Sequence, residues 1–448
     1  MRTPAYLFSA RVPRYTSYPT APHFHAGVTG EIFRGWLAAL PQAMPLSLYL
    51  HVPFCDTLCW FCGCHTKIVN HYSPLASYLD VLLKEIATVS AVIGRGHKVT
   101  HIHWGGGSPT MLSPGDVKRL AGALETHFEI APGAEFAIEI DPRGLKDETI
   151  AALAEAGVGR ASIGVQDCDE TVQRAINRIQ PFEVTLSAVE RLRAAGIGAL
   201  NIDLIYGLPH QTRENVARTI DMALTLTPQR FAVFGYAHVP HFKKHMQLID
   251  ENVLPGAEER LAQFELAHTM LSASGYAAIG LDHFARPEDS LALAQKAGRL
   301  ARNFQGYTTD DAPALIGLGA SSISALPQGY AQNKPEVPDY RKAILAGELA
   351  VARGIALSDD DRLRRAIIER LMCDLAVDLD AAGAPFGKSA ADFAPELAAL
   401  APYTEQGVVE IEGGRLAVPP ASRAAVRLVA AAFDLYLGKS QAVHAVAV

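Results

Sequence analysis

The stretch LSLYLHVPFCDTLCWFCGC, residues 46–64, joins an apolar run to a cluster of cysteines. Residues 47–52 are mostly apolar and include an aromatic residue, which favours a buried strand. Four of the six cysteines in the chain follow this run within ten residues, namely Cys55, Cys59, Cys62 and Cys64. The other two, Cys168 and Cys373, are isolated. Clustered cysteines in a chain without a secretory leader indicate metal or redox chemistry and not a disulfide framework.

The spacing Cys55-x3-Cys59-x2-Cys62 favours an iron–sulfur cluster over zinc. Thiolates bind soft or borderline metals, and closely spaced cysteines hold iron–sulfur clusters. A structural zinc site usually takes four ligands, often as two separated pairs, and this chain has no second CxxC pair. Cys64 lies only two residues beyond Cys62, too close for one tight loop to aim both at one cluster easily. Zinc and inert buried thiols are the alternatives.

The cysteine loop follows the first of six strand candidates that alternate with helical stretches. The strands are expected at residues 47–52, 99–104, 135–140, 160–165, 199–205 and 230–234, and helices at residues such as 73–89, 114–126, 146–156 and 184–195. This alternation predicts βαβ units and a parallel sheet. Because the strands are almost continuously apolar, the fold class is α/β, with the sheet closed or nearly closed into a barrel.

Polar residues and glycines gather where these predicted strands end. Glycines 105–107 follow the second strand, Glu139 and Asp141 close the third, Gln166 follows the fourth and Asp203 lies in the fifth. Active sites of parallel barrels are built at the carboxyl ends of the strands. Glycine lets a backbone approach a ligand closely, and carboxylates accept hydrogen bonds from hydroxyl and ammonium groups. We therefore expect a ligand site at this edge, although a tight turn and helix caps would also explain these residues.

The alternation stops near residue 330. Residues 358–373 are expected to form a helix with Ser358 as its N-cap, and residues 408–418 a hairpin that turns at Gly413 and Gly414. Helix, hairpin and helix together suggest a winged helix, but the segment has no basic excess. We therefore divide the chain into an N-terminal extension (1–45), a barrel (46–330) and a mostly helical C-terminal domain (331–448), with no nucleic-acid partner.

Composition excludes several classes of protein. The chain has 448 residues, of which 49% are hydrophobic and 19% charged, with a formal net charge of −7. This apolar content argues against disorder, and mild acidity argues against nucleic-acid binding through bulk charge. The apolar stretch 424–437 is interrupted by Arg427 and Asp434, short of the ~20 apolar residues of a membrane span. No signal peptide is evident, so a globular cytoplasmic enzyme without a membrane partner is expected.

The CxxxCxxC motif after the first strand, followed by WGGGSPT at residues 104–110, resembles the radical S-adenosylmethionine (SAM) superfamily. The similarity extends further to the family of oxygen-independent coproporphyrinogen III oxidases, and runs from about residue 13 to the last helix. The matching segments are RYTSYPT (14–20), CWFCGC (59–64), GVQD (164–167) with Asn177 and Arg178, NIDLIYGLPHQT (201–212), YAHVP (236–240), LDHFARPED (281–289) and RNFQGYTT (302–309). This resemblance implies a partial (β/α)6 TIM-like barrel with an N-terminal extension over the active site.

The resemblance also implies two cofactors and the residues that hold them. Cys55, Cys59 and Cys62 would hold a [4Fe–4S] cluster, and SAM would chelate its open iron. In the family two SAM molecules occupy the site. Positions that contact the cluster-bound SAM are matched by Tyr49, Gly106 and Glu139, and positions that contact the second SAM by Phe61, Cys64, Gly107, Ser108, Gln166, Arg178, Asp203, Ala237 and Ile323. Ser108 replaces the Thr common in the family and keeps its hydroxyl, and Cys64 is the candidate catalytic residue.

The implied reaction is oxidative decarboxylation of two propionate side chains of coproporphyrinogen III to vinyl groups, giving protoporphyrinogen IX in haem biosynthesis. A 5′-deoxyadenosyl radical derived from SAM would take a hydrogen atom from the β-carbon of a propionate. An electron donor for the cluster and a final electron acceptor are further partners, and we expect a monomer. Basic residues that the four substrate carboxylates could meet are Lys67, Arg143, Lys243, Lys244, Arg286 and Arg302.

Two related functions compete with this interpretation. A haem-binding, chaperone-like branch of the superfamily has no oxidase activity, and typically keeps the three ligand cysteines but lacks the fourth cysteine and the RYTSYPT segment. This chain has both Cys64 and residues 14–20, which favours the oxidase. SAM-dependent methyl transfer and haem degradation, found in other relatives, form the third class.

Overall fold

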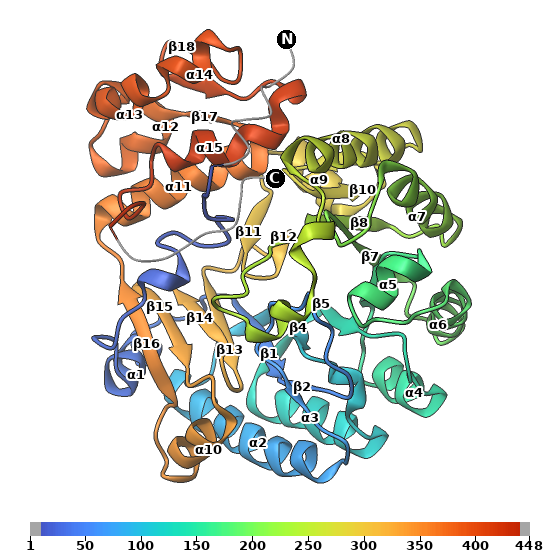
Figure 1. Cartoon of the computed structure of the whole chain (residues 1–448). Helices are drawn as coiled ribbons and strands as arrows, with labels where there is room; N and C mark the ends of the chain where they lie inside the picture. Colours follow the sequence, from blue (N-terminus) through green and yellow to red (C-terminus); the bar gives the residue numbers. More distant parts are fainter. Residues whose placement is uncertain (1–9, 440–448) are drawn as a thin grey trace.

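The computed structural model describes residues 10–439, and these residues are built around one large sheet (Figure 1). Within them the sheet has 12 strands in the order β16-β15-β14-β13-β1-β4-β5-β6-β7-β8-β10-β9. Seven neighbouring strands at its centre are parallel: β13 (Ala314–Leu318), β1 (Leu46–Val52), β4 (Lys98–Gly106), β5 (Glu129–Ile140), β6 (Arg160–Gln166), β7 (Ala199–Tyr206) and β8 (Arg230–Gly235). Six of them, from β1 to β8, contain the strands expected from the sequence.

A helix follows each of these six strands, and in Figure 1 the helices lie in an arc outside the sheet. They are α2 (Ser73–Ile93), α3 (Pro114–His127), α4 (Asp147–Glu155), α6 (Phe182–Ala194), α7 (Arg213–Thr225) and α8 (Ala257–Ala273), with the short α5 (Glu170–Ala175) before α6. Local sequence fixes their starts: the Ser113 hydroxyl accepts from the Asp116 N–H, and Thr212 forms a capping box with Asn215. This arrangement confirms the partial (β/α)6 barrel.

The barrel stays open because antiparallel strands extend both edges of the sheet. On one side lie β14 (Ile323–Leu326), β15 (Gly329–Asn333) and β16 (Val351–Ala356), and on the other β10 (His283–Ala285) and β9 (Ala277–Ile279). The sequence pattern predicts no strand in these segments. Two smaller pairs, β2 (Phe54–Cys55) with β3 (Lys67–Ile68) and β11 (Ala301–Asn303) with β12 (Gly306–Thr308), lie outside the large sheet.

Further helices pack around the sheet or form the C-terminal part. Helix α1 (Gly30–Ala38) contacts α2 and β16, and α10 (Val337–Leu345) packs on α2. The C-terminal part holds α11 (Asp359–Asp374), α12 (Leu379–Gly383), α13 (Ala394–Ala399), α14 (Ala401–Glu405), α15 (Val426–Ala431) and a small sheet of β17 (Ala376–Asp378), β19 (Arg415–Ala417) and β18 (Glu410–Glu412). Ser358 caps α11 and the hairpin turns at Gly413 and Gly414, as expected. The boundaries at residues 45 and 330 stay predictions.

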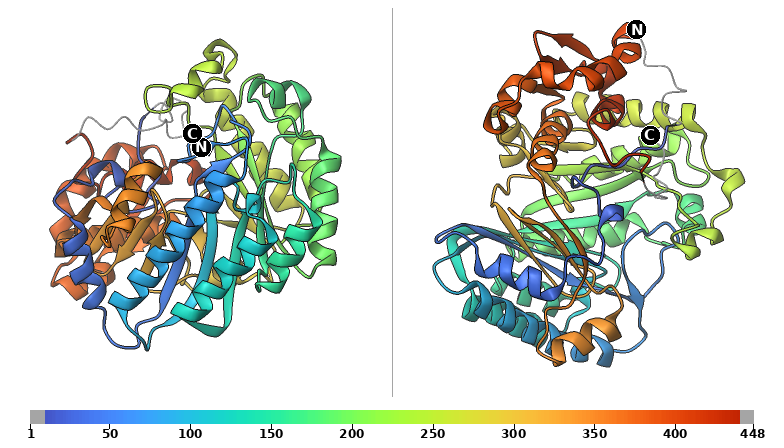
Figure 2. Two further views of the ribbon diagram at one scale, coloured as in Figure 1. Left: turned by 90° about the horizontal axis from the view of Figure 1, so that it is seen from below. Right: turned by 90° about the vertical axis from the view of Figure 1, so that its left-hand side faces the viewer.

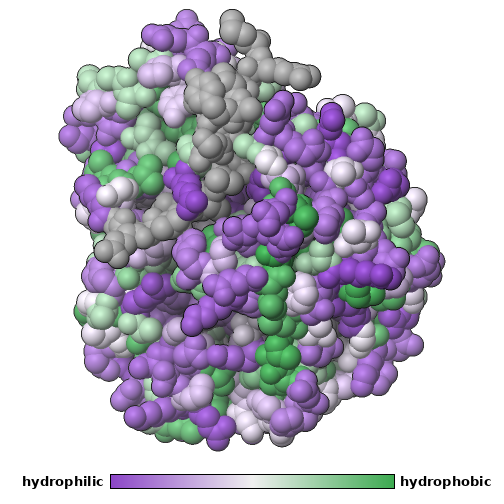
Figure 3. Space-filling model, viewed as in Figure 1, coloured by the Kyte–Doolittle hydropathy of each residue, from purple (hydrophilic) through white to green (hydrophobic). Residues whose placement is uncertain are grey.

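The C-terminal part and the barrel share one hydrophobic core, although Figure 2 shows the C-terminal elements to one side of the barrel. Side chains such as Leu48, Trp104 and Ile202 from the barrel belong to the same buried cluster as Leu371 and Phe433. Figure 3 shows mainly hydrophilic surface on the face seen in Figure 1, with a hydrophobic band down its middle. Within residues 10–439, no helix is both long enough and apolar enough to span a membrane.

Candidate active site

The cysteine loop (residues 53–64) is hydrogen-bonded at its start to the glycine run (residues 105–107) at the end of β4. The N–H of Gly107 donates to the Val52 carbonyl at 2.9 Å, and the N–H of Ser108 donates to the Phe54 carbonyl at 2.7 Å. The Ser108 hydroxyl also lies 3.9 Å from the Cys55 sulfur. Since a Cβ on Gly107 would stand 2.4 Å from the Phe54 carbonyl oxygen, only glycine permits this approach.

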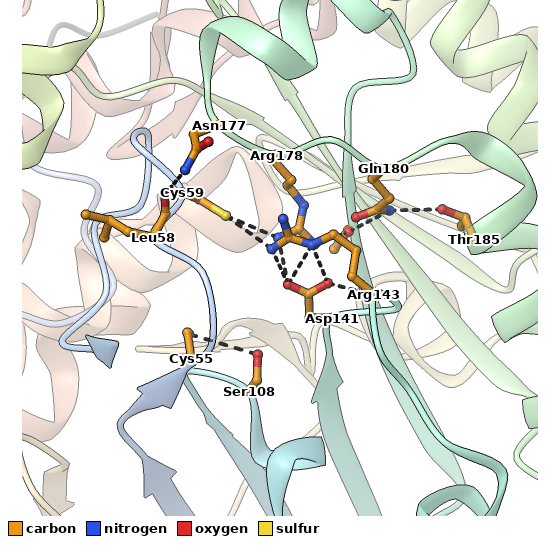
Figure 4. A network of polar contacts seen from close by, with 11 residues as sticks. Cys55, Leu58, Cys59, Ser108, Asp141, Arg143, Asn177, Arg178, Gln180 and Thr185 are labelled. Atoms are coloured by element: carbon orange, nitrogen blue, oxygen red, sulfur yellow. Dashed lines mark hydrogen bonds and ion pairs between the residues drawn. The ribbon is translucent and has the colours of Figure 1, made fainter. Parts of the chain in front are cut away.

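Two arginines converge on the sulfur of Cys59, as Figure 4 shows. Nη2 of Arg143 lies 3.4 Å and Nη1 of Arg178 lies 3.5 Å from this sulfur. Oδ2 of Asp141 accepts from both guanidinium groups, at 2.6 and 3.0 Å. Burial raises the pKa of Asp141, but the hydrogen bond and charge of Arg143 and the charge of Arg178 outweigh burial and leave this pKa below its usual value. The carboxylate therefore stays ionised and holds both cations beside the loop.

Cys62 and Cys64 form a hydrogen-bonded pair on the other side of the loop. This hydrogen bond is the largest cause that lowers the pKa of Cys62 to about 7 and raises the pKa of Cys64 well above its ordinary value. The segment after β8 covers the pair: Nζ of Lys243 donates to the Cys64 carbonyl and Nε2 of His245 to the Cys62 carbonyl, both at 2.8 Å. The Cys64 residue is nonetheless exposed.

Glu139 on β5 faces the glycine run. Its Oε2 accepts from the Gly106 N–H at 3.0 Å, and its Oε1 lies 3.3 Å from Nε2 of His103. Burial raises the pKa of Glu139, but His103 and the Gly106 N–H outweigh burial and lower it overall. The backbone of Gly106 has φ +110°, and a Cβ there would lie 2.6 Å from the ring of His51. Glu139 is therefore an ionised carboxylate hydrogen-bonded to buried backbone at the end of β4.

Tyr49 and His51 on β1 complete this half of the site. The hydroxyl of Tyr49 lies 3.0 Å from Nδ1 of His51, and the Tyr49 ring stacks on His103 with centroids 5.8 Å apart. Burial lowers the pKa of His51, so a neutral imidazole is favoured, and its Nε2 hydrogen-bonds to the His65 carbonyl. These aromatic side chains form one wall beside Glu139.

A second polar group lies on β6 and β7. Asp203 accepts from the Ser162 hydroxyl at 2.9 Å and from Nδ2 of Asn201 at 2.7 Å. Burial, assisted by the charge of Glu139, raises the pKa of Asp203 to about 7. Gln166 ends β6 with a left-handed backbone, φ 69°. Nη2 of Arg178 donates to the Gly164 carbonyl at 2.6 Å, so the guanidinium connects β6 to the cysteine loop.

A cavity of about 790 Å³ opens between these strands and the antiparallel edge of the sheet. Five of the predicted site residues line it: Tyr49, Cys64, Gly106, Glu139 and Ile323. The lining also includes residues that the sequence analysis did not single out for the site, among them Ala21, Pro22, Phe304, Gln305, Gln332 and Arg353. We call this space the central cavity.

The other predicted residues are outside the lining of the central cavity. Cys55, Cys59, Cys62, Gly107, Ser108, Gln166, Arg178 and Asp203 lie in or against the cysteine loop, the glycine run and the ends of β6 and β7. Phe61 packs in a hydrophobic cluster with Val172 and Tyr236, and Ala237 follows β8. The six basic candidates do not line the cavity; Lys67, for example, pairs with Glu336, and Arg286 lies over the Tyr276 ring.

The residues of the loop fit an iron–sulfur cluster in chemistry and attachment. Three thiols on one loop lie beside two guanidinium groups, which offset the charge that thiolates and a cluster bring. In this conformation each thiol has its own partner, and among residues 10–439 no three His, Cys, Asp or Glu side chains are gathered to hold a metal ion. Ligation therefore requires the thiols to turn toward a common centre.

Comparison with known proteins supports the same assignment. The model of the radical SAM superfamily matches residues 49–223, and the model described as the HemN C-terminal domain matches residues 357–424. The superfamily implies a [4Fe–4S] cluster and SAM as cofactors. An oxygen-independent coproporphyrinogen III oxidase of Bradyrhizobium diazoefficiens is 50% identical over 438 residues, which cover 98% of this chain and 97% of that protein.

Two further relatives support the same family assignment. The enzyme of the same name from Cereibacter sphaeroides is 47% identical over 430 residues, covering 96% of this chain and 95% of that protein. The structure of coproporphyrinogen III oxidase from Escherichia coli, described as a radical SAM enzyme, superposes with a TM-score of 0.90 at 38% identity, covering 95% of this chain and 100% of that chain. With such identity over nearly its whole length, the chain belongs to the oxygen-independent coproporphyrinogen III oxidase family of the radical SAM superfamily.

Proposed function

We propose that this protein converts coproporphyrinogen III to protoporphyrinogen IX by oxidative decarboxylation of two propionate side chains. The observation that carries the proposal is the position of the cysteine loop. Its residue Cys64 lines the central cavity of about 790 Å³ together with Tyr49, Gly106 and Glu139. A reactive centre on this loop would thus stand beside a space large enough for an organic substrate.

The proposal assigns the cluster to Cys55, Cys59 and Cys62. The guanidinium groups of Arg143 and Arg178 donate to the Cys59 sulfur and would continue to neutralise the loop. When bound, the cluster and SAM supply a 5′-deoxyadenosyl radical that removes a hydrogen atom from a substrate carbon. The chain itself would bind and orient these groups, because Lys243 and His245 donate to the carbonyls of Cys64 and Cys62 and so fix the loop beside the cavity.

SAM would be held by the ionised and polar groups around the loop. Glu139 accepts hydrogen bonds and stays ionised, which suits the ammonium or a ribose hydroxyl of the cluster-bound SAM beside Tyr49 and Gly106. For a second SAM, the available groups are an amide in Gln166, a guanidinium in Arg178 and a carboxylate in Asp203, with Phe61, Cys64, Gly107, Ser108, Ala237 and Ile323 around them. The assignment of these residues to the first and the second SAM is part of the proposal.

The central cavity suits a large apolar macrocycle with charged side chains. Pro22, Phe304, Leu315 and Ile323 contribute apolar surface, and most of the exposed wall is apolar. The relatives that match 95–98% of this chain are named as oxidases, which favours the oxidase over a haem-binding chaperone. We further propose that the protein is a cytoplasmic monomer, that an electron donor reduces its cluster, and that a final acceptor takes the electrons from the substrate.

The direct test is anaerobic incubation of the reconstituted protein with coproporphyrinogen III, SAM, a reductant for the cluster and an electron acceptor. We expect protoporphyrinogen IX, two CO₂ per substrate, and methionine with 5′-deoxyadenosine. A Cys59→Ser protein carried through the same reconstitution is the control and should form none of these products. Tight haem binding without CO₂ release would instead establish the chaperone-like function.

A further inference from the structure

Arg353 is the only Arg or Lys among the described residues that line the central cavity. It lies on β16, the antiparallel edge strand, and was not expected from the sequence. The one carboxylate in the same lining, Glu139, lies on β5. The cavity therefore has a cationic end and an anionic end.

The guanidinium of Arg353 is oriented but not neutralised. Within residues 10–439 its side chain makes one hydrogen bond, from Nε to Oε1 of Gln332 at 2.7 Å. Burial lowers the pKa of Arg353, and no neighbouring carboxylate acts to raise it. The neutral amide of Gln332 thus fixes the plane of the Arg353 guanidinium group and leaves its two Nη groups free to donate to another acceptor.

The histidines in the lining do not add permanent positive charge. Burial lowers the pKa of His51, and burial together with the charges of Lys243 and Arg353 lowers the pKa of His65 to about 4. Both imidazoles are therefore neutral near pH 7. Arg353 carries the one permanent positive charge that this lining offers to an anionic substrate.

Strand order separates Arg353 from the residues that the parallel strands contribute to the central cavity. From β1, which holds Tyr49 and His51, the sheet runs through β13, β14 and β15 before it reaches β16. Four steps at the usual strand spacing amount to ~19 Å along the curved sheet. The same lining includes apolar residues such as Leu315, Ile323 and Phe304.

We propose that Arg353 binds the carboxylate of a propionate that the product retains, and so anchors the porphyrinogen while a different propionate reacts. This inference rests on the proposed function. The planar guanidinium group matches a carboxylate in geometry, and the apolar part of the cavity lining suits the macrocycle. Gln332 acts as a positioning residue because it orients the guanidinium through Nε.

The test measures steady-state kinetics and porphyrin binding in Arg353→Gln, Arg353→Lys and Gln332→Glu. In Arg353→Gln, the KM for coproporphyrinogen III should rise roughly ten- to a hundredfold, the effect of losing a charge-assisted hydrogen bond. The kcat should stay within about twofold, since the anchor is remote from the reacting carbon. Lysine should restore part of the affinity, because charge remains and the fork is lost.

Gln332→Glu leaves Arg353 in place and tests its charge. A carboxylate at this position would pair with the guanidinium, so the KM should rise as in Arg353→Gln, without loss of the arginine. The matched control is Arg341→Gln, which removes an exposed guanidinium on α10 and should not change the KM. SAM cleavage without substrate should be equal in all these proteins.

Anaerobic fluorescence titration with coproporphyrin III and protoporphyrin IX separates the remaining outcomes. Protoporphyrin IX keeps two propionates, so Arg353→Gln should raise the Kd of both porphyrins by a similar factor. Weaker coproporphyrin III binding alone would mean that Arg353 contacts a reacting propionate and would overturn the anchor. An unchanged KM in an active Arg353→Gln enzyme would also overturn it, whereas an inactive wild-type protein would refute the proposed function instead.

Discussion

Cys59 and Cys64 lie in the same loop but contact different groups. Cys59 is buried and its sulfur accepts from the guanidinium groups of Arg143 and Arg178. Cys64 is exposed, lines the central cavity and pairs with Cys62. The spacing of the cysteines alone distinguished three candidate ligands from a fourth cysteine, and these different surroundings give that distinction a physical basis.

Cys64→Ser should keep a full cluster and lose most decarboxylation. Serine keeps the approximate volume but changes the polarity of the cavity wall and removes the sulfur. The measurements are iron and sulfide content, the visible spectrum and product formation on one preparation. Cys59→Ser should lose iron because a cubane held by two thiolates has too few protein ligands, and Cys168→Ser should behave as wild type. If Cys64→Ser lost as much iron as Cys59→Ser, Cys64 would be a ligand.

Glu139→Gln should leave iron content unchanged and weaken SAM binding. The amide is isosteric but loses the charge that holds His103 and the Gly106 N–H. Loss of a charge-assisted hydrogen bond costs about 1.5–3 kcal/mol, so the Kd for SAM should rise roughly ten- to a hundredfold. Glu129→Gln, an exposed change at the start of the same strand, is the control. Iron loss with normal SAM affinity would place Glu139 against the cluster instead.

Sequence reasoning found groups that belong to short motifs and missed groups that tertiary structure brings in. Glu139 and Gly106 lie at the carboxyl ends of parallel strands, where active sites are built, so the sequence predicts that they lie close together. Arg353 is the only polar side chain on a short strand far along the chain, and no local pattern marks it as a functional residue. Asp141 was noted only as a carboxylate at a strand end, and its role between Arg143 and Arg178 required the fold.

At the scale of elements, Glu85 joins α2 to the antiparallel edge of the sheet. Its carboxylate accepts from the Gly319 N–H at 2.6 Å, the Tyr340 hydroxyl at 2.7 Å and Nδ2 of Asn333 at 2.6 Å. These contacts fix the turn between β13 and β14, whose next residues, Ser321 and Ser322, line the central cavity. A buried carboxylate thus positions one wall of the site.

This carboxylate should make stability depend on pH. Burial raises the pKa of Glu85 to about 7, above the value of ~4.3 expected in the unfolded chain. Between these values the folded state binds more protons, so the free energy of unfolding should fall as pH rises, by roughly 3–4 kcal/mol in total. The stabilisation is full below pH ~4.3 and is lost as pH rises through about 7.

Urea unfolding between pH 5 and pH 8 checks this dependence. Glu85→Gln should lower stability at pH 5, because the amide nitrogen cannot accept a hydrogen bond, and should flatten the pH dependence. Glu348→Gln, an exposed change, should keep the wild-type slope. An equal slope in Glu85→Gln and wild type would assign the pH dependence to other groups.

The barrel strands and helices followed from sequence periodicity, whereas β13 to β16 did not. The six central strands are apolar runs separated by amphipathic helices, and that alternation is a local signal. Residues 314–333 contain small, polar and glycine residues, because β14 and β15 are short strands with close neighbours. In β15, for example, the Cβ of any residue at position 329 would meet the Ile355 carbonyl at 2.1 Å. Such constraints come from tertiary packing, so they produce no periodic pattern of apolar residues in the sequence.

At the scale of the whole molecule, the N-terminal segment connects the C-terminal part to the barrel. Tyr18, 1% exposed, accepts at its hydroxyl from the Leu435 N–H at 3.1 Å, and its carbonyl accepts from the Tyr330 hydroxyl of β15 at 3.3 Å. The Tyr15 hydroxyl donates to Asp434 at 3.1 Å. Since Ala21 and Pro22 follow directly and line the central cavity, the same segment completes the substrate wall.

Tyr18→Ala should therefore loosen the N-terminal segment and weaken substrate binding together. Removing a fully buried aromatic ring costs about 3–5 kcal/mol, and Tyr18→Phe, which keeps the ring and leaves the Leu435 N–H without its acceptor, should cost about 1 kcal/mol. Trypsin should cut after Arg11 or Arg14 faster in Tyr18→Ala than in Tyr18→Phe, with the rest of the chain intact. The KM for coproporphyrinogen III should rise in the same order, while SAM cleavage without substrate stays at the wild-type rate. Unchanged cleavage near Arg14 in Tyr18→Ala would show that Tyr18 does not hold the segment, and a raised KM without faster cleavage would separate the cavity wall from this anchor.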